Sequence, residues 1–259
     1  MKACKWMGAV AAATLLLTSC LGEGDNSFSG SGFGVAGISE TNYQPILYTA
    51  VGPMYSSATA ALTPGTCWLV SYSVDLNSPE NTSTSTSGAY YATISQMQEI
   101  ETGAVYYSSR DTAALMPNEI ALSNAGLAGG EPAASYIDGH LFLGAALNAY
   151  NNQINNFSLY WNQADSAVVE DNISTYSLYL RAVKQSDGTG STASAKTEFR
   201  AFDLGSTIES IARKEGKDGA ESFYLKIHYI SEINEKDSTD LTWSSFRVAC
   251  AAMDPDSEN

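Results

Sequence analysis

The chain has 259 residues, of which 28 are acidic and 13 are basic, so its formal net charge at pH 7 is −15. Between residues 20 and 130 the only basic residue is Arg110, so this half can neutralise neither a phosphate backbone nor an anionic lipid surface. Nucleic acid is therefore excluded as an expected partner, and the hydrophobic content of 44% is sufficient for real cores.

The first 20 residues have the anatomy of a secretory signal that ends in a lipidation site. Lys2 and Lys5 precede an apolar run at 7–17, which is too short to span a bilayer. Residues 17–20 match the lipobox of bacterial lipoproteins. We therefore predict a signal peptide at 1–19 and a lipidated Cys20 whose acyl chains fasten the protein to a membrane. The alternative is an ordinary secreted protein in which Cys20 is a free thiol.

Residues 20–34 are rich in Gly, Ser and acidic residues, which predicts a flexible tether. Gly32, Gly34 and Gly37 also match G-x-G-x-x-G, the pattern of a loop that cradles a pyrophosphate. That loop needs a preceding strand and a following helix, and neither is predicted here. We interpret the glycines as a chance match and expect no cofactor.

The first half after the tether contains short alternating runs typical of strands, in a chain rich in Ser, Thr, Asn and Tyr. Strands are predicted at 35–40, 46–50, 66–75, 89–98, 104–107 and 118–122. Residues 76–88 are polar and of low complexity, and predict a long exposed loop. The glycine-rich segment 125–135 is the predicted domain boundary.

The second half has clearer alternation, with strands predicted at 140–147, 157–162, 176–183, 199–204, 223–230 and 243–250. Residues 184–197 predict a second polar loop. Ser206 and Glu209 fit a capping box, and the apolar stripe after them predicts one short helix that ends near Gly216. The domain division is 35–128 and 129–255, followed by an acidic tail at 256–259.

Two cysteines, Cys67 and Cys250, remain in the mature chain once Cys4 is removed and Cys20 is lipidated. An oxidising compartment permits a disulfide between them. Alternation places Cys67 on the face opposite its apolar neighbours and Cys250 on the apolar face of its own strand, which argues against pairing.

The chain resembles the NigD-like lipoproteins of Gram-negative anaerobes. The resemblance rests on LLLTSC, GTCWLVSYSV, NFSLYWNQ, and FDLGS leading through a short helix into YLKIHYIS. It implies an all-β protein with an N-terminal OB-like barrel followed by a C-terminal β-sandwich. It implies no activity that could be assigned to named residues.

Residues with catalytic potential are few. His140 and His228 lie in separate predicted strands, without a nucleophile elbow or zinc-ligand spacing, and are interpreted as ordinary strand histidines. Glu99 and Glu101 share strand parity, as the carboxylates of a glycosidase would, but solvated surface acids are the expected case. We therefore predict neither a catalytic site nor a metal site.

Tyrosine is abundant, and the pairs at 90–91 and 106–107 each predict one ring outside the sheet. Exposed tyrosines among Ser, Thr and Asn can form an adaptable binding surface, but packing and ordinary exposure are the favoured interpretation. Thr112, Ser166 and Ser238 each follow Asp and precede a small or apolar residue, a pattern that resembles an O-glycosylation signal of secreted proteins.

These observations predict a non-enzymatic protein, lipid-anchored in the cell envelope and most simply in the outer membrane, that binds a protein or glycan partner. One alternative is an immunity-type protein that blocks an incoming toxin. A hydrolase is the third hypothesis. The oligomeric state and the membrane face are left open by the sequence.

Overall fold

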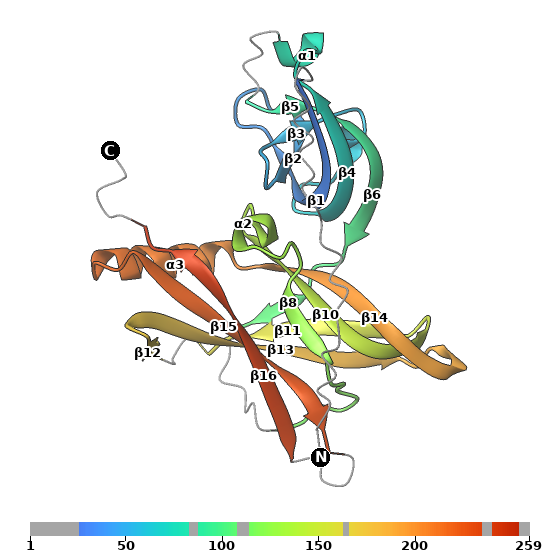
Figure 1. Cartoon of the computed structure of the whole chain (residues 1–259), viewed down its shortest axis with the longest axis vertical. Coiled ribbons are helices and arrows are strands. Elements are labelled where there is room, and N and C mark those ends of the chain that lie inside the picture. The colour runs from blue at the N-terminus through green and yellow to red at the C-terminus, as the bar shows by residue number, and fades with distance from the viewer. Residues whose placement is uncertain (1–25, 83–87, 108–113, 163–165, 235–239, 254–259) are drawn as a thin grey trace, which may run out of the picture.

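The structure, a computed structural model, describes residues 26–82, 88–107, 114–162, 166–234 and 240–253. A small barrel is stacked on one end of a larger β-sandwich (Figure 1). The predicted all-β architecture, with the barrel first, is confirmed. The predicted signal peptide, Cys20 and the tail at 256–259 lie outside the described residues. Within the described part, no helix is long and apolar enough to cross a membrane.

The barrel is one curled sheet in the order β5-β3-β2-β1-β4-β6. Its strands are β1 (Ser27–Ile38), β2 (Pro45–Thr49), β3 (Met54–Tyr55), β4 (Cys67–Asp75), β5 (Tyr90–Tyr91) and β6 (Thr93–Ile100). A short helix, α1 (Pro79–Thr82), lies within the segment predicted as a long polar loop, and a 3-10 turn covers Thr59–Ala61.

The prediction of a flexible tether through residue 34 is wrong, because β1 begins at Ser27. The small residues of this segment serve close packing. A Cβ added to Gly34 would lie 2.7 Å from the Leu47 side chain on β2, and the Ser31 hydroxyl lies 2.7 Å from that of Ser71 on β4. The glycines of the G-x-G-x-x-G pattern therefore lie inside a strand.

Two sheets form the sandwich, one with the order β14-β10-β8 and the other with the order β16-β15-β13-β11-β7. Its strands are β7 (Ala104–Tyr106), β8 (Asn124–Leu127), β9 (Tyr136–Ile137), β10 (His140–Asn151), β11 (Ile154–Tyr160), β12 (Val168–Glu170), β13 (Ile173–Ser186), β14 (Thr189–Asp203), β15 (Ser222–Ile233) and β16 (Leu241–Ala251). Two helices complete it, α2 (Pro132–Ser135) and α3 (Gly205–Lys217).

The sheets place the domain boundary near residue 101 and not at residue 128. β7 pairs with β11 and β8 pairs with β10, so both strands belong to the sandwich. The glycine-rich segment 125–135 misled the prediction, because β8, a turn and α2 all lie within it. No strand forms at 118–122, although an isolated bridge joins Glu119 to Val183 and the Ile120 and Leu122 N–H groups donate to the Ala182 and Ile230 carbonyls.

The predicted polar loop at 184–197 is also wrong, because most of it is strand. Residues 184–186 end β13, and β14 starts at Thr189 and pairs with β10 over almost its whole length. Most of residues 189–197 are exposed on this long arm, so their polar composition reflects exposure rather than loop structure.

Helix α3 is present as predicted, but the capping box is not. Its N-cap is Leu204, which makes no side-chain capping bond, and Ser206 lies inside the helix. Leu204 is fully buried, so core packing sets the start of the helix. Gly216, the predicted end, also lies inside the helix, which ends at Lys217. A Cβ at this position would lie 1.7 Å from the Met253 carbonyl oxygen, so close packing requires glycine there.

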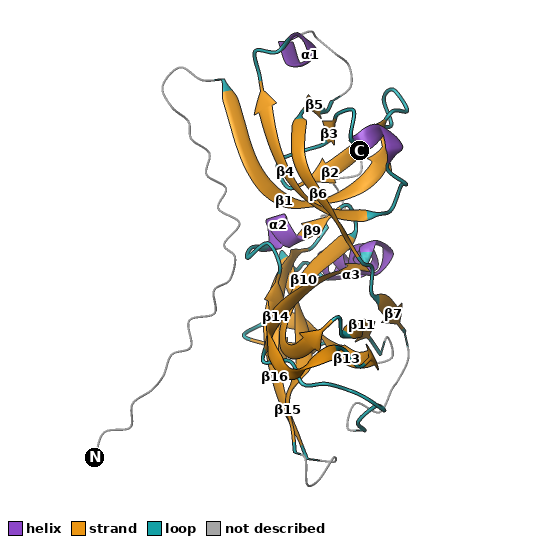
Figure 2. Ribbon diagram, turned by 90° about the vertical axis from the view of Figure 1, so that its right-hand side faces the viewer, coloured by secondary structure: helices purple, strands orange, loops and turns teal. Residues whose placement is uncertain are grey.

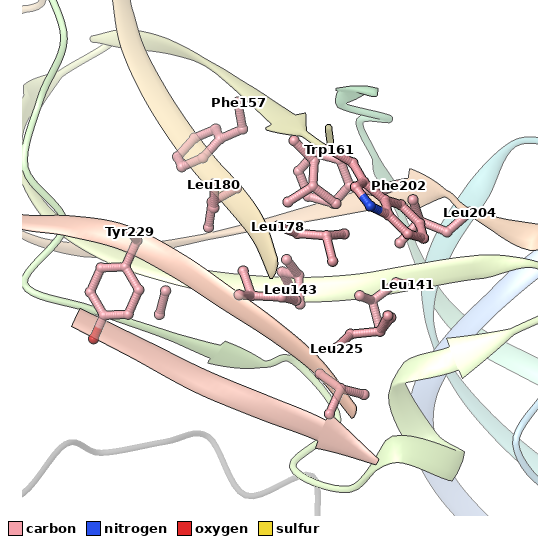
Figure 3. Packing of buried hydrophobic residues seen from close by; sticks show 14 of the residues in the cluster. Leu141, Leu143, Phe157, Trp161, Leu178, Leu180, Phe202, Leu204, Leu225 and Tyr229 are labelled. Atoms are coloured by element: carbon pink, nitrogen blue, oxygen red, sulfur yellow. The ribbon is translucent and has the colours of Figure 1, made fainter. Parts of the chain in front are cut away.

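The sandwich core is formed by side chains that both sheets direct inward (Figure 3). Leu141 and Leu143 of β10 face Leu178 and Leu180 of β13, and Leu225 of β15 joins them. All five are at most 2% exposed. These positions follow the alternation of the sequence, which explains why these strands were predictable.

A separate apolar cluster joins the two domains. The Phe33 ring of β1 stacks on the Phe142 ring of β10, with centroids 4.8 Å apart, and meets Phe199 of β14 edge to face at 5.5 Å. Val35 and Ile100 from the barrel and Ile137 and Ala201 from the sandwich are buried in the same cluster. Figure 2 shows β9 and α2 at this junction, between the barrel and the sandwich. The barrel therefore shares a core with the sandwich.

Cys67 belongs to this interdomain cluster and Cys250 lies on β16, and both are free thiols. No disulfide joins these two cysteines in the structure. Cys67 lies opposite its apolar neighbours, as alternation predicted, and that face is buried against the sandwich. Burial raises the pKa of each thiol to about 11, so both stay protonated at neutral pH.

Replacement of Phe33 by Ala tests the shared core. We expect Phe33→Ala to lower the free energy of unfolding by about 3–5 kcal/mol, because it removes a buried ring and leaves a cavity between the domains. Denaturant unfolding of the full-length protein measures the change. Ile154→Ala, at a side chain that is 51% exposed, is the control and should change stability by no more than about 0.5 kcal/mol. Equal effects of the two substitutions would contradict the shared core.

Candidate functional site

A polar cleft of about 460 Å³ lies where the barrel meets the sandwich. Its walls are residues 98–101 at the end of β6 and residues 196–200 of β14, and residues 153–155 at the start of β11 complete it. Clefts of this size at domain junctions are a common location for binding sites. The described cysteines and histidines do not line it.

The shape of the cleft follows from one point of contact between its walls. Thr102 and Ala201 form a parallel bridge, in which the Ala201 N–H donates to the Glu101 carbonyl at 3.1 Å and the Gly103 N–H donates to the Ala201 carbonyl at 2.8 Å. β6 and β14 therefore run in the same direction towards this point, and their edges separate before it. A Cβ on Gly103 would lie 2.3 Å from the Phe202 ring, so glycine is required at this crossing.

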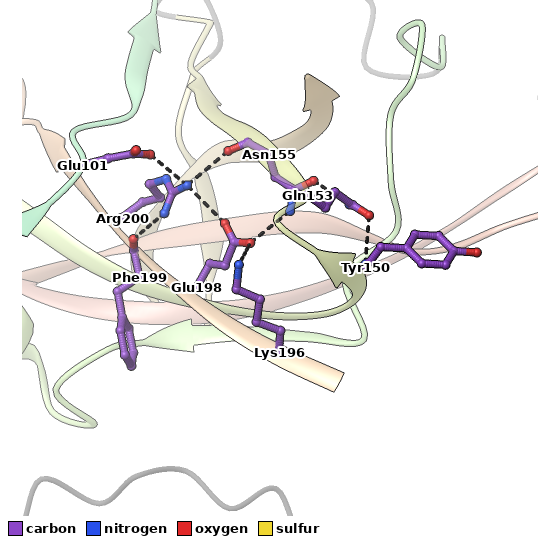
Figure 4. Close-up of polar contacts among 8 residues, drawn as sticks. All are labelled: Glu101, Tyr150, Gln153, Asn155, Lys196, Glu198, Phe199 and Arg200. Atoms are coloured by element: carbon purple, nitrogen blue, oxygen red, sulfur yellow. Dashed lines mark hydrogen bonds and ion pairs between the residues drawn. The ribbon is translucent and has the colours of Figure 1, made fainter. Parts of the chain in front are cut away.

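The floor of the cleft is a chain of hydrogen bonds between buried polar side chains (Figure 4). The Gln153 amide nitrogen donates to the Asn155 side-chain oxygen at 2.7 Å, and the Asn155 amide nitrogen donates to Glu198 at 3.0 Å. Gln153 also accepts the Tyr150 N–H at 3.2 Å, in the turn between β10 and β11. Gln153, Asn155 and Glu198 are at most 7% exposed, so the chain fixes β11 relative to β14, on the sandwich side of the cleft.

Two cations hold the buried Glu198 carboxylate. Lys196 Nζ lies 3.0 Å from one oxygen, and Arg200 Nη2 lies 3.1 Å from the other. Arg200 Nη2 also lies 2.9 Å from the Glu101 carboxylate and donates to the Asn155 carbonyl. Its guanidinium carbon is 4.9 Å from the centroid of the Phe157 ring. Arg200 therefore ties the interdomain linker to both sheets of the sandwich.

The polar groups of the floor thus form hydrogen bonds and ion pairs with one another, and the groups on the rim are those to which a ligand can bind. Gln98, Glu99 and Thr197 are exposed, and no side-chain hydrogen bond to any of them is found within the described residues. Ile154 adds an apolar side chain that is 51% exposed. The rim offers amide, hydroxyl and carboxylate groups, and its barrel wall carries no cation.

The predicted carboxylate pair, Glu99 and Glu101, lies on this rim. Both side chains are exposed, as expected of surface acids. Glu101 nevertheless has a structural partner in Arg200. The sequence did not predict a cleft role for Lys196, Glu198 or Arg200. Residues 184–197 were predicted to be a polar loop, and Arg200 was predicted to be one polar position in a strand. The available signal was the spacing of two basic residues, Lys196 and Arg200, on either side of the acidic Glu198 in one strand.

The two predicted strand histidines lie on strands of different sheets of the sandwich. His140 Nδ1 contacts the Asp138 carbonyl at 2.9 Å. His228 Nε2 lies 3.2 Å from the Ser177 hydroxyl, and its ring stacks on Tyr179 with centroids 5.0 Å apart. Burial, and to a lesser degree the Lys226 charge, lower the pKa of His228, so its imidazole is neutral at pH 7. Among the described residues, no group of His, Cys, Asp and Glu side chains could hold a metal ion.

Tyrosine exposure differs between the two predicted pairs. In the first pair Tyr90 is exposed and Tyr91 is half-buried, but in the second Tyr106 and Tyr107 are both 46% exposed. Tyr107 lies just past β7 and bonds to Thr207 on α3. The Thr112 and Ser238 glycosylation patterns lie outside the described residues, and Ser166 is exposed.

The sandwich carries a row of rings on one face, but these rings cover each other. Tyr106, Tyr160, Tyr179 and His228 are in register on four adjacent strands. The first two rings stack with an interplanar angle of 20°, and the last two with an angle of 19°. Because their faces are turned towards each other, this row offers little flat ring surface to a sugar. The cleft is the stronger candidate site.

The comparisons with known proteins identify the barrel. Residues 24–98 match the family model described as "Lipoprotein OB domain". The match and the sheet order of the barrel together support an OB fold for the N-terminal domain. The OB-like barrel predicted from the sequence is confirmed, and the match ends just before the linker to the sandwich. Together with the lipobox at 17–20, it indicates a lipid-anchored protein of the cell envelope. No curated protein matches the chain.

Solved structures extend the similarity to the whole fold. An uncharacterized protein from Parabacteroides merdae is 22% identical with a TM-score of 0.71, over 86% of this chain and 99% of that chain. A "putative lipoprotein" from Bacteroides fragilis is 11% identical with a TM-score of 0.55, over 89% of this chain and 99% of that one. A NigD-like immunity protein from Bacteroides caccae, 12% identical over 87% of this chain and 97% of that one, has a TM-score of 0.47. The first two structures, with the OB match, confirm the fold that the resemblance implied, a barrel followed by a sandwich.

The two ion pairs of Arg200 differ in burial, so loss of the buried pair should lower the free energy of unfolding more than loss of the exposed pair. Arg200→Met leaves the Glu198 carboxylate buried with one cation fewer, and should lower the free energy of unfolding by about 3 kcal/mol. Glu101→Gln removes only a partner that is 72% exposed, and should cost less than about 1 kcal/mol. Denaturant titration of both variants measures the difference. The reverse order would show that Arg200 does not hold the junction through Glu198.

Proposed function

We propose that this protein is a lipid-anchored, non-enzymatic protein of the cell envelope that binds a protein partner in the cleft between its barrel and its sandwich. The observation that carries the proposal is the construction of the cleft. Its floor is a bonded polar network on the sandwich side that reaches the linker through the Arg200–Glu101 pair, and Gln98, Glu99 and Thr197 on its rim have no side-chain partner among the described residues. Preformed walls reduce the ordering cost of binding.

The absence of enzymatic activity is supported by the state of the Glu198 carboxylate, the most deeply buried acid of the cleft. A general acid or base must exchange a proton with a substrate within hydrogen-bond reach. Here Lys196, Arg200 and Asn155 already surround this carboxylate. Its role in the proposal is structural.

A protein fits the cleft better than a glycan or a nucleic acid. Sugars bind well to exposed ring faces, and the aromatic side chain of the cleft, Phe199, is packed against Phe33. Nucleic acid needs available cations, but the barrel wall has none, and Lys196 and Arg200 on the sandwich wall are paired with Glu198. Strand edges flank the cleft on both sides, and these suit a polypeptide.

A lipid anchor would hold the end of the barrel at which β1 begins, away from the cleft, near a membrane surface. Lipidation of Cys20 would leave only residues 21–26 between the lipid and β1. We propose the outer membrane as the location. A partner would then be an envelope protein or a segment of one.

Site-specific photo-crosslinking tests the proposal. A photoreactive amino acid at Ile154, in the cleft, should give a discrete protein adduct in intact cells that produce the full-length protein. The same amino acid at Val168, 58% exposed on β12 and outside the cleft, is the control and should not give that adduct. Identical adducts from the two positions, or adducts from Val168 alone, would argue against a partner in the cleft.

A further inference from the structure

The barrel wall of the cleft is the free edge of a sheet. β6 is the last strand in the sheet order, and its residues pair with β4 from Thr93↔Ser73 to Ile100↔Cys67. Within the described residues, no backbone hydrogen bond joins β6 to any other strand. Every second N–H and C=O of such an edge points outward and can pair with another strand.

Two hollows lie along this edge. One is the cleft itself, and the other, of about 440 Å³, is lined by residues 96–98 together with Ser31, Leu69 and Ser71. Gln98 lines both. Side chains on one face of an added strand are about 6.8 Å apart, so consecutive side chains on that face could enter the two hollows.

The charge of the edge selects its partner. Glu99 and Glu101 stand at its cleft end, and β6 itself contains no cation. Pairing with β6 of a second copy would bring no cation to these acids, because β6 contains none. The β14 edge across the cleft carries Lys196 and would repel a basic segment. A basic strand is therefore best matched to β6.

We propose that an extended polypeptide segment of the partner, carrying Lys or Arg, adds as a strand to the free edge of β6 and places a basic side chain beside Glu99. The proposal rests on the binding function proposed above and names its mode. Main-chain hydrogen bonds to β6 would supply affinity, and the two hollows and Glu99 would supply selectivity.

A random linear-peptide library, screened against the full-length protein in detergent, tests this proposal. Enriched peptides should be rich in Lys or Arg. N-methylation along one such peptide should weaken binding at every second position, because only alternate N–H groups face β6. Glu99→Lys should weaken binding at least about tenfold. Glu80→Lys, the same charge change on α1 at the far end of the barrel (Figure 1), should leave it unchanged.

Other outcomes separate this mode of binding from the binding function. Strand addition would be overturned if the N-methylation profile lacked a period of two. It would also be overturned if Glu99→Lys and Glu80→Lys weakened binding equally. If neutral glycans bind the full-length protein and library peptides do not, the partner class is wrong. If crosslinking from Ile154 still yields a protein adduct but no library peptide binds, strand addition is wrong and the proposed binding of a protein in the cleft is retained.

Discussion

The contact between Phe33 and Phe142 is the constraint on which the rest of this structure depends. It sets the barrel against the end of the sandwich, and the buried residues around it come from both domains. The linker bridge at Thr102 and Ala201 forms beside this contact, because Ala201 belongs to the same cluster. The direction of β6 relative to β14, and so the cleft between them, follows from how these rings pack.

Polar groups then hold the cleft open at the edge of that apolar junction. A buried charge network is seldom favourable in net free energy, since desolvation offsets most of the attraction. Its effect here is geometric. Arg200 contacts the linker through Glu101, β11 through the Asn155 carbonyl and its own strand through Glu198. Apolar side chains at these positions would fill the cleft and bring its walls together.

Much of this fold was readable from the sequence, because alternation and burial coincide. The strands that contain Leu141, Leu178 and Leu225 were predicted for that reason. Where they do not coincide, prediction failed. Residues 189–197 of β14 are largely exposed and read as a loop, and the start of β1, where Gly34 packs on Leu47, reads as a tether. The cleft joins residues 98–101 to 196–200, a pairing that no local pattern contains.

The central claim is that the two domains form one rigid unit with a preformed cleft. A pair of spin labels, one on Ser73→Cys in the barrel and one on Asn156→Cys in the sandwich, measures this directly by pulsed electron spin resonance. Both positions are exposed, whereas the native Cys67 thiol is buried and Cys250 is largely protonated at neutral pH. The account predicts one narrow distance distribution that broadens in Phe33→Ala. A broad distribution in the protein with its native core would contradict it.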